Sequence, residues 1–336
     1  MDLTTSYLGL TIKNPIIAGA SPLNAELDTI RRLEEFGAAA VVLPSIFEEQ
    51  IEHEDRLIEE LIAVGSETYA EALSYFPVQT AYALGPDRYL ELVRRAAKAV
   101  DIPVIASLNG TTDHGWVHYA RQLQEAGASA IELNIYFIPS DLELSGRDVE
   151  QRYLNVLKAV RQAVSLPVAA KVGPYFSAPG HMAQQLERAG ADGLVFFNRF
   201  YQPDIELATL SFRSDIELSR PYEMRLPLLW VGLLAGRVRA SLAASTGVES
   251  ADEVVKYLLA GADVVMTTAS LLRHGIAHMK ELVAGLESWL AARELHSLKL
   301  IRGRMSRHNI GDPTAFERAN YIKTLHAYNS RSELLR

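Results

Sequence analysis

The stretch SLAASTGVESADEVVKYLLAGADVVMTTAS, residues Ser241–Ser270, holds a complete strand, turn, helix and strand. The apolar runs 241–244 and 263–269 are predicted strands. The residues between them have helical periodicity that ends at Gly261, a residue type that favours the end of a helix. Strands that alternate with helices in this order form parallel βαβ units, so the stretch predicts an α/β protein with a parallel sheet.

Both predicted strands in this stretch end in small hydroxyl residues. Ser245, Thr246 and Gly247 form the turn after the first strand, and Thr267 and Thr268 close the second. Backbone N–H groups at such turns bind anions, and the start of a helix favours negative charge. In a (β/α)8 barrel the loops after the last two strands are a usual phosphate site. We therefore predict a phosphate-binding site here, with two ordinary strand–loop junctions as the alternative.

A phrase in which a helix ends in Gly-Ala before an apolar strand occurs four times. It covers residues 36–45, 126–135, 189–198 and 260–269. Together with strands entered through proline, it predicts eight strands that begin near Pro15, Ala39, Pro103, Ala130, Pro167, Gly193, Ser241 and Asp263. Eight is the strand number of a TIM (β/α)8 barrel, which is the predicted fold. A doubly wound open sheet is the alternative, but no G-x-G-x-x-G follows any strand.

The N-terminal region predicts two further elements. Leu3–Lys13 is expected to form a hairpin that turns at Gly9 and closes the bottom of the barrel. Asp28 is the predicted N-cap of a helix over 29–36, which Gly37 ends.

Three segments exceed what a barrel needs, namely 47–86, 201–225 and 296–336. Long loops at the C-terminal face of a barrel usually carry substrate contacts, although a role in packing or dimer contact is equally open. No linker divides the chain, so we expect a single domain over 1–336.

The composition limits the function. The 336 residues are 49% hydrophobic and 22% charged, as in a soluble globular protein. The net charge of −8 argues against nucleic acid or an anionic membrane as the main partner. No cysteine is present, which excludes disulfides and thiolate metal sites. No signal peptide or membrane span is predicted, and we expect a cytoplasmic location.

Polar residues at the carboxyl ends of the predicted strands are the candidates for chemistry, because barrel enzymes place catalysis there. Lys171 ends an apolar run and needs an anion or an electron-rich partner. A Schiff base, stabilisation of a reduced flavin ring and a structural salt bridge are all open. Asn134 and Asn198 lie in apolar runs, where amides need hydrogen bonds. Two amides and a lysine suit a planar heterocycle with carbonyl and N–H edges.

Metal binding is not predicted. His114 with His118, and His274 with His278, have i,i+4 spacing without an H-E-x-x-H motif, and we predict solvated helix faces. No Walker A motif and no G-x-S-x-G elbow occur.

At these residues the chain resembles the dihydroorotate dehydrogenase family, whose members are FMN-dependent (β/α)8 barrels. The resemblance covers most of residues 3–290. It runs through NPIIAGAS at 14–21, IELN at 131–134, AAKVGPYF at 169–176, ADGLVFFN at 191–198, Leu218-Ser219, STGVES at 245–250 and GADVVMTTA at 261–269.

The resemblance implies roles for individual residues. It places Lys171 near flavin N1/O2, where reduced flavin gains negative charge. It places Asn134 against both flavin and substrate, and Asn198 against substrate. The full set of predicted cofactor contacts is Ala20, Ser21, Ser45, Asn109, Asn134, Lys171, Ser219, Thr246, Gly247, Thr267 and Thr268.

The chain departs from the family at three places. Phe137 stands where the family has a Cys or Ser base, and Pro44 stands where it has a Lys near flavin and substrate carboxylate. Residues 73–77 occupy the position of the family's N-x-x-G-L-P-N substrate loop. Ser140 is the nearest hydroxyl, so Ser140 and Lys171 are the predicted catalytic residues.

The resemblance implies an FMN-dependent oxidoreductase that oxidises dihydroorotate to orotate, a step of pyrimidine biosynthesis, or a related cyclic substrate. A flavin-dependent dihydropyrimidine-type reductase is one alternative. A non-catalytic flavin- or phosphate-binding barrel in a redox complex is another. The resemblance also implies a homodimer. Because the chain has no cysteine, any iron–sulfur cluster would belong to a redox partner protein.

Overall fold

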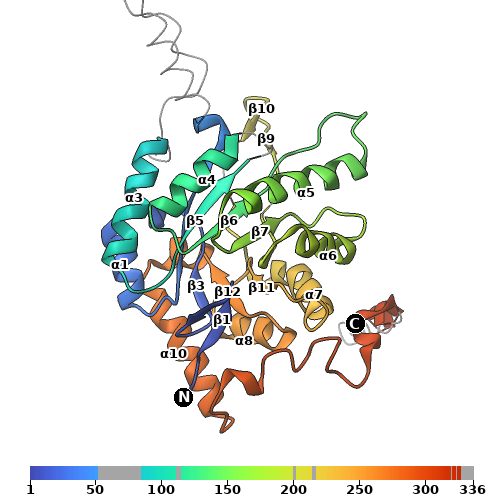
Figure 1. The fold of residues 1–336 in the computed structure, drawn as a ribbon. Coiled ribbons are helices and arrows are strands. Elements are labelled where there is room, and N and C mark those ends of the chain that lie inside the picture. The colour runs from blue at the N-terminus through green and yellow to red at the C-terminus, as the bar shows by residue number, and fades with distance from the viewer. Residues whose placement is uncertain are drawn as a thin grey trace, which may run out of the picture.

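The computed structural model describes residues 1–51, 85–110, 115–199, 202–213, 217–318, 320–322 and 324–326. His114 and residues 73–77 lie outside the described residues. Eight parallel strands close into a barrel in the order β3-β4-β5-β6-β7-β8-β11-β12 (Figure 1). They are β3 (Ile16–Ala18), β4 (Val41–Phe47), β5 (Val104–Asn109), β6 (Ala130–Asn134), β7 (Val168–Val172), β8 (Gly193–Phe196), β11 (Ser241–Ala244) and β12 (Val264–Thr267). The predicted TIM barrel and its eight strands are confirmed.

Helices surround the strands in the ring that Figure 1 shows. The described ones are α1 (Leu27–Glu35), α3 (Pro86–Ala99), α4 (Gly115–Glu125), α5 (Gly146–Ala163), α6 (Pro179–Ala189), α7 (Arg225–Leu234), α8 (Ala251–Ala260), α9 (Ala269–His274) and α10 (His278–Ala291). Where the Gly-Ala phrase occurs, Gly37, Gly127, Gly190 and Gly261 have φ between +97° and +119°. This left-handed conformation ends each helix and turns the chain into the next strand, as predicted. Within the described residues, no helix is long and apolar enough to cross a membrane.

The predicted N-cap of the first helix is wrong. The 3-10 turn η1 (Pro22–Ala25) ends just before α1, so the extended residue is Glu26 and the helix begins at Leu27. Asp28 lies inside the first turn and pairs with Arg31 at 3.3 Å. Its carboxylate still lies near the positive end of the helix dipole.

The N-terminal hairpin closes the bottom of the barrel, as predicted. β1 (Thr5–Tyr7) and β2 (Leu10–Ile12) are antiparallel. Tyr7 and Leu8 are buried among the inward side chains of the barrel strands. A Cβ on Gly193 would lie 2.5 Å from Leu8 Cδ2, so the hairpin packs directly against the glycine backbone of β8.

Two further described segments lie outside the barrel, one after β8 and one at the C-terminal end. After β8, a short hairpin of β9 (Asp204–Glu206) and β10 (Ser211–Arg213) precedes the 3-10 turn η2 (Pro221–Met224). The C-terminal segment, with η3 (Leu298–Leu300) and η4 (Pro313–Phe316), packs on the outer helices. Its Gly303 N–H donates to Leu258 of α8, and Phe316 lies against Gly232 of α7. The described part of this segment therefore supports the helical ring.

Candidate functional site

A cavity of about 300 Å³ opens at the carboxyl ends of the barrel strands. Ten of the predicted site residues line it: Ala20, Ser21, Ser45, Lys171, Asn198, Ser219, Thr246, Gly247, Thr267 and Thr268. They follow different strands that converge at one face, which is why residues so far apart in sequence meet there. Glu217 and Leu218, from the long excursion after β8, also line this cavity.

Lys171 has a buried anionic partner. Its Nζ lies 3.4 Å from Oε1 of Glu132, whose side chain is 1% exposed, while the Lys171 side chain is 13% exposed. The Glu132 Oε2 atom is buried without a hydrogen-bond partner among the described residues. The sequence analysis missed Glu132, although a carboxylate within the apolar run of β6 is the signal that could have found it. The pair places a lysine charge in the lining of the cavity.

Three predicted amides lie close together. The Asn198 Nδ2 atom donates to Asn134 Oδ1 at 2.6 Å. Asn134 lies opposite Asn109 on β5 and opposite Lys171 on β7. Asn134 and Asn109 are buried and do not line the cavity, whereas Asn198 does. The sequence predicted each of these amides as a site residue, and the structure gives Asn198 the accessible position.

The turn after β11 has a left-handed backbone at two consecutive residues. Thr246 and Gly247 have φ of +87° and +72°, in the left-handed region. The Gly247 N–H donates to Ser219 Oγ at 3.2 Å, and a Cβ on Gly247 would lie 2.8 Å from the Arg220 carbonyl oxygen. Glycine is therefore needed for the close approach of the Ser219 loop. The Tyr257 hydroxyl donates to the Thr246 carbonyl at 2.8 Å and fixes the turn on α8.

The Thr267 hydroxyl at the end of β12 is engaged within the protein. Thr267 Oγ1 lies 2.6 Å from Ser270 Oγ and donates to the Val248 carbonyl at 3.3 Å. A Cβ on Gly19 would lie 2.7 Å from Thr268 Oγ1. Glycine thus lets the end of β3 approach the Thr268 hydroxyl, beside the turn after β11.

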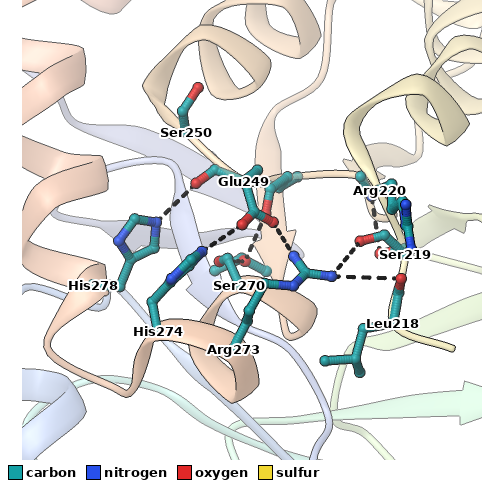
Figure 2. Close-up of polar contacts among 12 residues, drawn as sticks. Leu218, Ser219, Arg220, Glu249, Ser250, Ser270, Arg273, His274 and His278 are labelled. Atoms are coloured by element: carbon teal, nitrogen blue, oxygen red, sulfur yellow. Dashed lines mark hydrogen bonds and ion pairs between the residues drawn. The ribbon is translucent and has the colours of Figure 1, made fainter. Parts of the chain in front are cut away.

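Figure 2 shows the contacts that connect the Ser219 loop to Arg273 and Glu249. Arg273 of α9 forms an ion pair with Glu249 and donates from Nη2 to the Ser219 carbonyl at 3.2 Å. His274 contacts the Glu249 carboxylate, and the Nε2 atom of His278 lies 2.8 Å from the Glu249 carbonyl oxygen. The predicted solvated helix face is wrong for His278, whose side chain is 13% exposed, because it packs onto this cluster.

The structure does not bring Ser140 to the cavity. Ser140 is exposed in the segment that follows β6. Phe137, at the family's base position, packs on α5, with its ring centroid 5.8 Å from that of Tyr153 and the Arg152 guanidinium 4.6 Å above it. This packing turns the aromatic side chain toward the helical ring.

Arg199 is a cavity residue that the sequence analysis did not single out. It follows Asn198 directly and lines the cavity. Its Nη2 atom lies 3.5 Å from Glu223 Oε1 of η2. The signal for it is a charged residue directly after Asn198, the amide that follows the apolar run of β8.

Comparison with known proteins decides the family. A model of the family "Dihydroorotate dehydrogenase" matches residues 81–290, more than half of the chain. The chain belongs to the dihydroorotate dehydrogenase family. Members of this family are FMN-dependent oxidoreductases that act on a CH–CH group, and this chain is a flavin oxidoreductase of the same kind.

Relatives carry two different activities in their names. A protein of Aeropyrum pernix assigned as dihydroorotate dehydrogenase A (fumarate) is 29% identical over 321 residues, which is 90% of this chain and 97% of the relative. The dihydroorotate dehydrogenase B (NAD(+)) catalytic subunit of Thermoplasma acidophilum is 25% identical, over 89% and 97%. The NAD-dependent dihydropyrimidine dehydrogenase subunit PreA of Escherichia coli is 24% identical, over 92% and 78%. The family is thus shown, while its members differ in substrate.

Proposed function

We propose that this chain binds FMN in the cavity and oxidises dihydroorotate to orotate, or a closely related cyclic substrate. The observation that carries the proposal is the joint presence of Lys171, Asn198 and the Thr246–Gly247 turn in one cavity at the barrel mouth. A lysine suits a flavin ring, an amide suits a substrate with carbonyl and N–H edges, and a backbone turn suits a phosphate.

The donor set fits FMN. Apolar side chains of Ala20, Pro44 and Met266 also line the cavity, and apolar surface suits a planar ring. In this proposal Ser21, Ser45 and Lys171 contact the ring, with Asn109 and Asn134 beneath the cavity supporting them. Ser219, Thr246, Gly247, Thr267 and Thr268 surround the phosphate. FMN supplies the acceptor for hydride, and the lysine charge stabilises the negative charge that a reduced ring carries.

The substrate and proton-transfer roles are also proposals. Asn198 holds the substrate through its side-chain amide, supported by its hydrogen bond to Asn134. Ser140 remains the candidate base, and this role requires the segment after β6 to move toward the cavity. General-base catalysis is typically worth ~10²–10⁴-fold in rate, so a slow reaction is expected while Ser140 stays outside.

The test is a titration of the purified protein with dihydroorotate in the absence of oxygen, followed by the visible absorption of oxidised flavin. Bleaching of that band supports the proposal. A protein that takes up no added FMN overturns the cofactor assignment. A flavin band that dihydroorotate leaves unchanged overturns the substrate assignment alone.

A dihydropyrimidine-type reductase is a second candidate. Its support is Pro44 in the place of the family lysine, together with the similarity to the dihydropyrimidine dehydrogenase subunit. Reoxidation of the chemically reduced flavin by uracil, without reduction by dihydroorotate, would favour it. If Lys171→Ala and Asn198→Ala change no turnover of either kind, a non-catalytic flavin-binding barrel is favoured.

The predicted homodimer, a redox partner protein and a cytoplasmic location remain proposals. The relatives named as catalytic subunits support a partner, since a subunit implies an assembly. Light scattering of the purified chain alone measures its oligomeric state, and co-purification under native conditions tests for a partner.

A further inference from the structure

The cavity contains two cations with different surroundings. Among the described residues that line it, the charged ones are Lys171, Arg199 and Glu217. Lys171 is matched by the buried Glu132 carboxylate at 3.4 Å. Glu217 is matched by Arg220 at 2.9 Å, outside the cavity wall.

Arg199 is the cation with the most unused hydrogen-bonding capacity. A guanidinium has five N–H donors in a fixed plane. Its ion pair to Glu223 is 3.5 Å long, and its Nη1 atom is buried without a hydrogen-bond partner among the described residues. Glu223 is also shared, because its Oε2 atom accepts the Arg220 N–H at 2.6 Å. Arg199 therefore keeps donors that the described residues leave unsatisfied, and its side chain lines the cavity.

Arg199 shares its cavity with a position that lacks the charge expected from the family. The family resemblance places a lysine near the substrate carboxylate at the position of Pro44, and Pro44 lines this same cavity without a charge. Arg199 enters the cavity from β8, next to the Asn198 amide. A planar guanidinium binds a carboxylate through two parallel hydrogen bonds, which a lysine cannot do.

We infer that Arg199 is a specificity-determining residue that binds the carboxylate of a planar cyclic substrate. The inference rests on the proposed function, because it assigns the substrate end of the same cavity. It favours a ring that bears a carboxylate over a neutral pyrimidine ring. The cation comes from the end of β8, whereas the family pattern supplies it after the second barrel strand.

The test compares two ligands that share a ring. Orotate carries a carboxylate and uracil does not. Their affinities for the purified protein are measured by calorimetry and, once FMN is bound, by the change in the flavin spectrum. The wild-type protein is expected to bind orotate more tightly. Arg199→Gln is expected to weaken orotate binding roughly ten- to hundredfold and to leave uracil binding unchanged.

Two further variants control this result. Arg199→Lys retains the charge without the planar guanidinium, so its orotate affinity should lie between those of the wild type and Arg199→Gln. Arg188→Gln removes the same charge from an exposed position in the last turn of α6, before β8 begins, and should change neither affinity.

Equal binding of the two ligands by the wild-type protein, undetectable binding of both, or an orotate preference that survives Arg199→Gln would overturn the inference. FMN uptake is measured separately by visible absorption. A protein without flavin therefore counts against the proposed cofactor, while the calorimetric comparison still decides the role of Arg199.

Discussion

The two ends of the barrel are built on the same strands but are filled in opposite ways. At the bottom, Tyr7 and Leu8 pack among inward apolar side chains. The Asn14 amide there is satisfied on both sides, donating to the Gly37 carbonyl at 2.7 Å and accepting the Ile16 N–H at 2.9 Å. At the mouth a cavity remains, and Glu132 and Arg199 each keep a buried polar atom without a partner among the described residues.

This difference separates stability from binding. Buried polar atoms without partners cost free energy, so they persist where a ligand or a function compensates for them. Changes at the bottom should therefore lower the free energy of unfolding and leave ligand affinity unchanged in the folded fraction. Changes at the mouth should alter ligand binding or catalysis more than the free energy of unfolding. Each of the following variants tests one side of this contrast.

The largest effect is expected at the bottom. Tyr7→Ala removes an aromatic side chain that is 2% exposed and should lower the free energy of unfolding by about 3–5 kcal/mol. Phe212→Ala, on a side chain that is 69% exposed, is the control and should have little effect. Denaturant unfolding measures both. A Tyr7→Ala protein that is as stable as the wild type would show that the hairpin does not close the core.

At the mouth, Lys171→Ala should act on catalysis. Loss of one charge that stabilises the reduced ring should lower kcat by ~10²–10³-fold, by analogy with removal of a single electrostatic donor. Anaerobic flavin reduction by substrate measures this rate. Because Lys171→Ala also leaves the buried Glu132 carboxylate without its partner, the rate is measured on folded protein only. An unchanged rate would contradict the role assigned to Lys171.

Glu132→Gln is the matched variant for Lys171→Ala. It retains the shape of the buried side chain and removes its negative charge below the cavity. The reduced flavin should then be stabilised relative to the oxidised form, so the reduction potential should rise, whereas Lys171→Ala should lower it. Measurement of the flavin reduction potential against a reference dye distinguishes the two directions. If both variants shift the potential in the same direction, Glu132 and Lys171 do not act on the flavin as opposite charges.

A smaller effect is expected at the cluster in Figure 2, where Arg273 connects the Ser219 loop to Glu249. Arg273→Gln removes the ion pair and should loosen the loop over the Gly247 N–H. Because one charge-assisted contact is lost, we expect FMN to dissociate faster and to bind roughly tenfold more weakly. Fluorescence of released flavin measures this rate. An unchanged dissociation rate would mean that the loop does not retain the cofactor.

Periodicity determined much of what the sequence could predict. The Gly-Ala phrase located the ends of four helices because only a left-handed residue turns the chain there, and Gly37, Gly127, Gly190 and Gly261 all adopt that conformation. The strand ends then located the cavity, because the carboxyl ends of barrel strands share one face.

The sequence pattern could not predict which side chains on different strands contact each other. Glu132 lies one strand away from Lys171 and 39 positions earlier in the chain, and nothing local indicates that the two side chains meet. The residue type of Asp28 favours a cap, but the 3-10 turn before α1 places the helix start at Leu27 instead. Arg199 and the Glu249 cluster depend on loop conformation, which periodicity does not describe.

The smallest expected effect concerns the capping box of α8, which lies directly after the turn at the mouth. Burial raises the pKa of the Glu253 carboxyl, but hydrogen bonds donated by the Ser250 side chain and backbone, together with Lys256, outweigh it and lower the pKa below its ordinary value of 4.5. The charged carboxylate therefore stabilises the folded state above the unfolded-state pKa. That contribution should disappear as the pH falls through the lowered pKa.

Ser250→Ala should cost about 1 kcal/mol at neutral pH, as the loss of an N-cap does, and the difference from the wild type should shrink below pH 4.5. Ser145→Ala, in the capping box of α5, is the matched control, and its Asp148 partner is exposed. Urea unfolding over a pH series measures both. Ser145→Ala should leave FMN affinity unchanged, whereas Ser250→Ala should weaken it slightly, because only Ser250 lies on the segment that holds the Gly247 turn. Equal effects of the two caps on FMN affinity would mean that α8 does not support the mouth.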